Sequence, residues 1–245
     1  MFTTESGLLV PGVTEDQMRE VDRIAMEDFG LGILQMMENA GRSLVLNVID
    51  MFGSSTGEVT VLAGSGGNGG GGMCCARHLS NHGFKVHLVL DRDPQQLGGS
   101  TRHQFNILHK AGLRPEEPND AGRLIRRAQV VVDALIGYSL KGSPKGRTAE
   151  LISLCNQNAA NVLSLDLPSG MNATTGETPG VVVYPARTLT LALPKIGLHQ
   201  VDGDLYLADI GIPPEVYQSL GISFEPFFNG RYWIRLNIGG RDVNH

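Results

Sequence analysis

The chain has 245 residues, of which 41% are hydrophobic, and a formal net charge of −5 at pH 7. This length is sufficient for one large domain with a full hydrophobic core. The acidic balance, without a basic stripe or tail, argues against generic nucleic-acid binding. No segment combines membrane-spanning length with freedom from charge, and no apolar leader follows residue 1, so we expect a cytoplasmic protein with no membrane partner.

Two helices are expected ahead of the first strand. The first begins at 14–17, where Thr14 and Gln17 have the spacing of a capping box, and its apolar residues recur at helical spacing up to Ala25. The second carries an apolar stripe from Ile33 to Val48 and stops at Gly53. Both helices are expected to pack across a sheet or against a partner subunit.

The rest of the chain alternates apolar strands with helices. Strands are expected at 59–63, 85–90, 129–135, 161–167 and 188–193, and helices at 73–79, 101–111 and 147–159. Near-continuous apolar strands separated by helices predict an α/β fold: a Rossmann-like, doubly wound, mostly parallel sheet with helices on both faces. We expect a single domain over 1–245, with N-terminal helices at 13–53, a core at 58–215 and a tail at 216–245 whose structure the pattern does not predict.

A glycine-rich run at 64–72 follows the first of these strands and leads into a helix. Backbone N–H groups without side chains, next to a helix N-terminus, favour the binding of anions such as nucleotide phosphate. Asn68 is the one sizeable polar side chain in the run. Its amide is either a ligand or a turn-forming group, because asparagine also tolerates left-handed backbone conformations.

Polar groups stand at two further strand ends. Asp133 lies near the end of one apolar strand, and Asp166 and Ser169 follow another. Each also has an ordinary structural interpretation: Asp133 as an acceptor of backbone N–H bonds, and Ser169 as a turn-capping residue. Together with Asn68 these side chains supply only hard oxygen ligands, which suit an alkali or alkaline-earth ion such as potassium and do not suit zinc.

Other candidates have weaker patterns. His78 and His82 are four residues apart on a predicted helix, without the pattern of a zinc protease. The basic loop 141–147 and Lys195 are either phosphate contacts or ordinary solvated groups. The three cysteines at 74, 75 and 155 match no disulfide or CxxC pattern and are expected to be buried reduced thiols. No GxSxG motif follows a strand, so hydrolase chemistry has no support.

A dinucleotide-dependent dehydrogenase is one alternative function. Residues 64–69 fit GxGxxG, and Asp91 closes the next strand at the distance expected of a ribose-binding acid. That interpretation gives no role to the polar strand ends.

Three segments together are more specific: GSGGNGGGGMCCARHL, VVDALIGYSLKG and LSLDLPSGMNATTG. They resemble the YjeF N-terminal domain family, the NAD(P)H-hydrate (NAD(P)HX) epimerases, and the resemblance extends from QMMENAGR upstream to LPKIGL downstream, covering roughly residues 14–215. It implies a Rossmann-like fold, usually dimeric, and interconversion of the R and S forms of NADHX and NADPHX.

The resemblance also implies roles for particular residues. Asp166 is the expected acid–base residue. Asn68, Asp133 and Ser169 are expected to hold a potassium ion. The expected substrate-binding residues are Asp166 and those of two loops: Gly67, Asn68, Gly69, Gly70 and Gly71 in the first, and Gly137, Tyr138, Ser139, Leu140, Lys141, Gly142 and Ser143 in the second. A separate NAD(P)HX dehydratase is the expected pathway partner.

This chain departs from the family pattern at three positions. Gly67 and Gly71 stand where the family has an asparagine and an aspartate, and Asn172 stands where an aspartate is common. The two glycines remove side chains from the presumed substrate loop. A second hypothesis is therefore a catalytically degenerate module of the same fold that binds nucleotide or acts as a protein scaffold, and the dehydrogenase remains a third.

Overall fold

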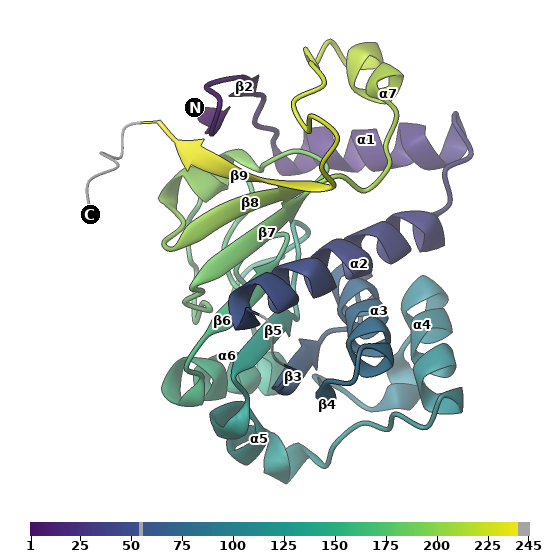
Figure 1. Cartoon of the computed structure of the whole chain (residues 1–245), viewed down its shortest axis with the longest axis vertical. Helices are drawn as coiled ribbons and strands as arrows, with labels where there is room; N and C mark the ends of the chain where they lie inside the picture. Colours follow the sequence, from purple (N-terminus) through teal and green to yellow (C-terminus); the bar gives the residue numbers. More distant parts are fainter. Residues whose placement is uncertain (54–55, 240–245) are drawn as a thin grey trace.

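The computed structural model describes residues 1–53 and 56–239, which build one mixed sheet of nine strands in the order β2-β1-β9-β8-β7-β6-β5-β3-β4 (Figure 1). The strands are β1 (Phe2–Thr4), β2 (Leu9–Val10), β3 (Glu58–Ala63), β4 (Lys85–Leu90), β5 (Val130–Ala134), β6 (Val162–Leu165), β7 (Arg187–Leu191), β8 (Asp204–Ala208) and β9 (Trp233–Ile238). Strands β3 to β8 pair in parallel, whereas β9, β1 and β2 add on in antiparallel fashion beside β8.

Seven α-helices accompany the sheet over the described residues. They are α1 (Glu15–Glu27), α2 (Ile33–Phe52), α3 (Gly67–Asn81), α4 (Gly99–Lys110), α5 (Ala121–Arg127), α6 (Gly146–Asn158) and α7 (Pro214–Ser219). The mostly parallel, doubly wound sheet predicted from the sequence is confirmed, and the five expected strands are present within two residues of their predicted bounds. Strands β1, β2, β8 and β9 and helices α5 and α7 were not predicted.

Alternation along the central strands divides the side chains between two cores. Val59, Val61 and Ala63 of β3 join a cluster with α2, α3 and α4; Figure 1 shows α3 and α4 side by side to the right of β3. Leu62 joins the other cluster, with α5 and α6. Helices therefore cover both faces of the parallel sheet, and function is expected where its strands end.

A third core fills the antiparallel end of the molecule. Helices α1 and α7 pack there with β1, β8 and β9, and Figure 1 shows both helices beside that end of the sheet. The predicted capping box begins α1: Thr14 Oγ1 accepts from Gln17 N at 3.2 Å, and Gln17 Oε1 accepts from Thr14 N at 2.9 Å. Helix α2 packs across the sheet face, against α3, which is one of the two placements expected for it.

The segment after residue 226 contributes a strand, although its sequence shows no clean periodicity. Strand β9 lies between β8 and β1, with Ile238 opposite Phe2. The last part of the predicted tail, 240–245, lies outside the described residues. Over 1–53 and 56–239, no helix is long and apolar enough to cross a membrane.

Candidate active site

A cavity of about 680 Å³ opens at the carboxyl ends of the parallel strands. Its walls come from α1, α2, the N-terminus of α3, and the loops that follow β5 and β6. Of the predicted site residues, those that line it are Gly67, Asn68, Gly71, Gly137, Tyr138, Ser139, Leu140, Lys141, Ser143 and Asp166; those that do not are Gly69, Gly70, Gly142, Asp133 and Ser169. The two predicted loops therefore meet at one cavity.

The glycine run is mostly helix, where a loop was expected. Helix α3 begins at Gly67, and the following glycines pack tightly on their neighbours, for example Gly70 on Met37 of α2 and Gly72 on Ala134 of β5. A Cβ at Gly64 would lie 2.0 Å from the Leu135 carbonyl oxygen, and one at Gly69 would lie 1.8 Å from that of Gly64. Close backbone packing thus requires glycine inside the run, while Gly66 and Gly67 have open space and expose the helix N-terminus to the cavity.

Asn68 is held at the edge of this cavity by its neighbours. Its Nδ2 donates to the Leu165 carbonyl oxygen at 2.7 Å. A Cβ at position 137 would lie 2.6 Å from Asn68 Oδ1, so Gly137 is needed for the amide to stay where it is. The position of the Asn68 amide therefore depends on glycine at position 137.

Asp166 lies directly after β6 with a strained backbone. Its φ of +69° is in the left-handed region, which costs a non-glycine residue of order 1 kcal/mol or more and is concentrated at functional sites. The side chain is 97% buried and lies against Lys195 Nζ, which also donates to the Leu191 carbonyl oxygen at 2.9 Å. Tyr138 N donates to Asp166 Oδ2 at 3.2 Å. The result is a buried ion pair on the cavity wall.

A second carboxylate faces the same cavity from α1. Tyr138 Oη donates to Asp22 Oδ2 at 2.6 Å. Burial raises the pKa of Asp22, and the bond from Tyr138 opposes that rise only in part. Burial also raises the pKa of the Tyr138 hydroxyl. The cavity thus holds one carboxylate paired with a lysine and another bonded to a neutral phenol, and such contrasting environments separate acid from base roles.

Asp133 is fully buried behind the cavity wall. Its Oδ1 accepts from Ser169 Oγ at 2.6 Å and from Leu135 N at 3.3 Å, and its Oδ2 accepts from Ser164 Oγ at 2.8 Å and from Ser169 N at 2.9 Å. Burial raises the pKa of Asp133, and the bonds from Ser169 oppose the rise. Over the part of the chain that the structure describes, no lysine, arginine or histidine forms an ion pair with it.

Asp91, the expected ribose acid of the dehydrogenase hypothesis, already has partners. Arg92 Nε donates to Oδ1 at 2.9 Å, and a second Arg92 nitrogen donates to Oδ2 at 3.1 Å. Thr148 Oγ1 donates to the same Oδ2 at 2.9 Å. Although Asp91 lines the cavity, most of its acceptor capacity is therefore used within the protein.

Sequence reasoning missed Asp22, which reaches the cavity from a helix far from the three motifs. Lys195 was expected to be a phosphate contact or a solvated group; the second interpretation is wrong, because its side chain is 1% exposed and pairs with Asp166. Ser169 Oγ bonds across to the loop after β5: it accepts from Ile136 N at 2.8 Å and donates to Asp133 Oδ1 at 2.6 Å. Asn172 Oδ1 accepts from Thr174 N at 2.9 Å and so closes a turn of its own. All three cysteines are free and buried, as expected.

Comparison with known proteins gives consistent matches. Residues 33–197 match the family described as "YjeF-related protein N-terminus". A protein of Dehalogenimonas lykanthroporepellens named "NAD(P)H-hydrate epimerase" is 47% identical over 240 residues, which is 96% of each chain. A protein of the same name from Rhodopirellula baltica is 34% identical over 88% of this chain and 90% of its own.

Two further matches concern fusion and fold. The "Bifunctional NAD(P)H-hydrate repair enzyme Nnr" of Salinibacter ruber is 33% identical over 88% of this chain, which aligns with only 44% of that enzyme. The crystal structure of the yeast protein YNL200c superposes with a TM-score of 0.82 at 21% identity, over 92% of this chain and all of that one, and shows the same fold. With its fold, its strand-end cavity and these matches, the chain belongs to the YjeF-related N-terminal family.

Proposed function

We propose that this protein is an NAD(P)H-hydrate epimerase, which interconverts the R and S forms of hydrated NADH and NADPH. The observation that carries the proposal is the buried Asp166–Lys195 pair on the wall of a cavity of about 680 Å³, beside a helix N-terminus. A cavity of this size accommodates a large part of a nucleotide. The relative named as this epimerase, 47% identical over nearly the whole chain, supports it.

The reaction needs an acid that protonates the leaving hydroxyl and a base that takes a proton from the attacking water. In the hydrated nicotinamide, water has added to a ring carbon next to the nitrogen. Inversion requires that the C–O bond break as the hydroxyl takes a proton and leaves as water, with the nitrogen lone pair supporting the ring cation. Water then attacks the opposite face and gives up a proton. One positioned carboxylate can serve both steps, and we assign that role to Asp166.

Lys195 is the proposed positioning group for Asp166. In the ion pair the shared proton lies on the Lys195 ammonium, and the pair has no net charge; this proton passes to the Asp166 carboxylate as Asp166 protonates the leaving hydroxyl. When that proton moves to the leaving hydroxyl, the ring acquires the positive charge that the pair has lost. The total charge in the buried site therefore stays constant, which keeps the electrostatic cost of the intermediate low.

Substrate binding is assigned to the two loops that meet at the cavity. The exposed N–H groups at the start of α3 suit the phosphates. Lys141, on the loop after β5, adds a positive charge at the cavity wall. The remaining residues of 67–71 and 137–143 are proposed to contact phosphates and sugars through their backbone.

We also propose that Asn68, Asp133 and Ser169 hold a potassium ion. The donor set fits, because it consists of oxygens only and contains a fully buried carboxylate without a cationic partner among the described residues. The ion would neutralise this charge and order the loops after β5 and β6. The four donors now on Asp133 imply that the Ser169 hydroxyl must turn away for an ion to bind.

The glycines at 67 and 71 support the second candidate, a binding module without turnover. A Cβ at Gly67 would meet nothing within 4 Å, so the cavity has open space where the family carries an amide. A Cβ at Gly71 would lie 3.0 Å from Leu165 Cδ2, so an aspartate there requires Leu165 to shift. The two candidates differ in one measurement, the turnover of the separated epimers.

The cellular setting is proposed along with the reaction. We infer a homodimer in the cytoplasm that acts beside a separate NAD(P)HX dehydratase. The relatives named bifunctional repair enzymes support a link with a second repair activity, because the segment that aligns with this chain makes up 44% or less of their length.

The test is an epimerisation assay with separated R- and S-NADHX. We expect the purified protein to equilibrate the epimers faster than the spontaneous reaction, and Asp166→Asn to lower the rate by about 10²–10⁴-fold. Asp120→Asn, an exposed substitution of the same kind, is the matched control. If the wild type gives no excess rate but binds the hydrate, the binding module is the correct function.

A second comparison in the same assay tests the potassium proposal. The same assay in potassium chloride and in tetramethylammonium chloride at equal ionic strength should show a faster rate with potassium. Asp133→Asn should remove the difference. Equal rates in the two salts contradict the ion but leave the epimerase proposal standing.

A further inference from the structure

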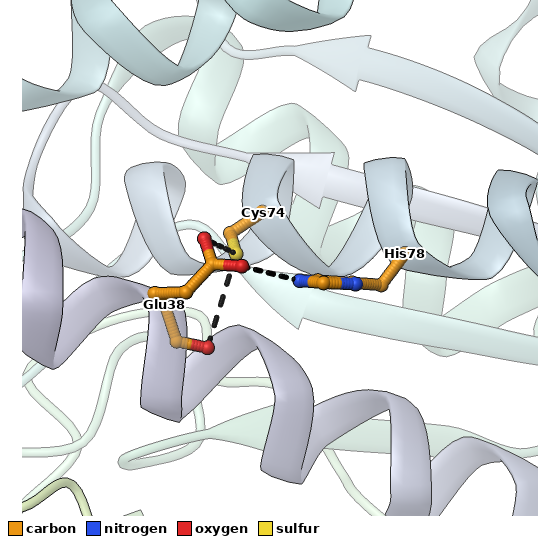
Figure 2. A group of neighbouring side chains, drawn as sticks. All are labelled: Glu38, Cys74 and His78. Carbon is orange, nitrogen blue, oxygen red and sulfur yellow. Dashed lines mark hydrogen bonds and ion pairs between the residues drawn. The ribbon is translucent and has the colours of Figure 1, made fainter.

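Three metal-ligating side chains meet on the pair of helices α2 and α3, outside the cavity described above. Figure 2 shows the carboxylate of Glu38 between the thiol of Cys74 and the ring of His78. Cys74 Sγ donates to Glu38 Oε2 at 3.1 Å, and His78 Nε2 lies 2.6 Å from Glu38 Oε1. One ligand atom from each residue lies within 4.8 Å of the other two. The group is therefore already gathered around a single point.

The helices fix this arrangement. Cys74 and His78 are four residues apart on α3 and so lie on one face of it, and Glu38 comes from α2. The two helices approach closely at this point, since a Cβ at Gly41 would lie 2.5 Å from Cys74 Sγ. The ligand atoms thus need only side-chain rotations to surround an ion.

We propose that Glu38, Cys74 and His78 form a binding site for a divalent cation of the zinc type, which ties α2 to α3. Thiolate, imidazole and carboxylate are the ligand types that Zn²⁺ and Co²⁺ take in proteins, and a water completes a tetrahedron when three protein ligands are present. Solvent can deliver the ion, because the Glu38 and His78 side chains are 38% and 20% exposed.

Arg77 is the group that competes with such an ion. One of its terminal nitrogens donates to Glu38 Oε2 at 2.6 Å and lies 3.4 Å from Cys74 Sγ. Its Nε is buried with no hydrogen-bond partner, so the guanidinium is only partly satisfied at this position. The ion replaces one positive charge with two beside the same carboxylate, and Arg77 moves outward.

Binding also displaces a proton. Burial and the neighbouring Glu38 raise the pKa of the Cys74 thiol to about 12, so the metal-free group is protonated. As the ion binds, the S–H bond breaks, the sulfur–metal bond forms and the proton leaves to solvent. The imidazole binds in its neutral form, with its proton on the nitrogen that does not face the ion.

The site has a mechanical consequence. Helix α2 supplies Met37 and helix α3 supplies Asn68 and Gly71 to the cavity wall. An ion that joins the two helices therefore stabilises the native state, and with it the wall, by an amount that grows with the ion concentration relative to Kd.

The experiment uses Co²⁺ as the probe on the full chain. We expect one Co²⁺ per chain, with the visible bands of a tetrahedral ion and a near-ultraviolet thiolate-to-cobalt band, both lost on addition of Zn²⁺. Cys74→Ala should abolish the thiolate band, whereas Cys155→Ala, which removes a buried thiol from the opposite core, should leave it unchanged. Thermal unfolding should shift upward with Zn²⁺ in the wild type and not in Cys74→Ala.

Arg77→Gln separates a metal site from a purely structural cluster. Removal of the competing guanidinium should tighten Co²⁺ binding by about tenfold or more, whereas a cluster that needs Arg77 would lose affinity with it. If Cys74→Ala does not fold, His78→Gln takes its place and should weaken binding while altering the visible bands. The proposal is wrong if wild type shows no thiolate band, if the band survives Cys74→Ala, or if Arg77→Gln weakens binding.

Discussion

Replacement of Lys195 by methionine tests whether the Asp166 carboxylate depends on its buried partner. Methionine keeps the length and apolar volume of the lysine stem but removes the ammonium. The carboxylate then remains 97% buried without its counter-charge, and the bond from Lys195 to the Leu191 carbonyl oxygen is lost as well. Breaking a buried pair in this way costs about 3–5 kcal/mol. For a chain of this size that corresponds to a fall in Tm of roughly 6–20 °C.

Urea unfolding, followed by circular dichroism, measures the change in free energy. The matched control is Arg235→Met, because the Arg235–Asp204 pair is exposed, with 47% and 42% of its side chains accessible. That substitution should cost about 0–1 kcal/mol. The same comparison in high salt should reduce only the effect at the exposed pair.

A double-mutant cycle gives the decisive result. Asp166→Asn removes the buried charge and is compatible with the left-handed backbone at 166, since asparagine tolerates that conformation. The Lys195→Met, Asp166→Asn double variant should therefore be more stable than the sum of the two single effects predicts, by 1 kcal/mol or more. A cost no larger than that of Arg235→Met, or strictly additive effects in the cycle, would refute the reasoning.

Three further outcomes are expected. Gly69→Ala places a Cβ 1.8 Å from the Gly64 carbonyl oxygen and should lower the free energy of unfolding in urea by at least about 3 kcal/mol. Gly67→Ala, whose Cβ meets nothing within 4 Å, should raise it by about 0.4–1 kcal/mol. Similar values for both variants would contradict the packing explanation of the glycine run. Because burial raises the folded-state pKa of Asp22, this residue contributes stability at low pH that is lost as the pH rises above about 3.8. The stability of Asp22→Asn relative to wild type should therefore increase with pH over that range and then level off. A difference that does not change with pH would contradict the raised pKa of Asp22. Tyr138→Phe, which removes the 2.6 Å bond to Asp22, should lower the epimerisation rate and cost about 0.5–1.5 kcal/mol in unfolding free energy. An unchanged rate in the steady-state assay would exclude a role for that bond in turnover.

The central part of the fold could be predicted from the sequence because its strands are buried on both faces. Such strands are continuous apolar runs, as in Val130–Ala134, and they stand out from the helices between them. The antiparallel end could not be predicted in this way. Strands β1 and β2 have only three and two residues, and β9 alternates apolar residues with arginine and asparagine, so each depends on pairing with a distant segment.

Some residues of the candidate site could be predicted from motif spacing, whereas their partners from distant segments could not. Motif spacing predicted that Asn68 and Asp166 share a cavity, and they do. It did not indicate that Lys195, considered as a phosphate contact or a solvated group, pairs with Asp166 from 29 positions along the chain. It also gave no indication of Asp22, which lies on a helix ahead of the sheet. The glycine run was interpreted as a phosphate loop because a sequence does not display the carbonyl oxygens that exclude a Cβ. In the structure several glycines of that run are required by close packing, and Ser65, Gly66, Gly67, Asn68 and Gly71 line the cavity.

The pairing of β1 with β9 has a consequence for how the protein is made. Strand β1 pairs with β2 within ten residues, but Phe2 also lies opposite Ile238 of β9, which is synthesised more than two hundred residues later. At 5–20 residues per second, translation takes roughly 10–50 s to reach that point. During this interval the parallel strands can assemble with their helices, while the buried side chain of Phe2 remains without its final neighbours. The β1–β2 hairpin can therefore form long before β9 joins it to the rest of the sheet.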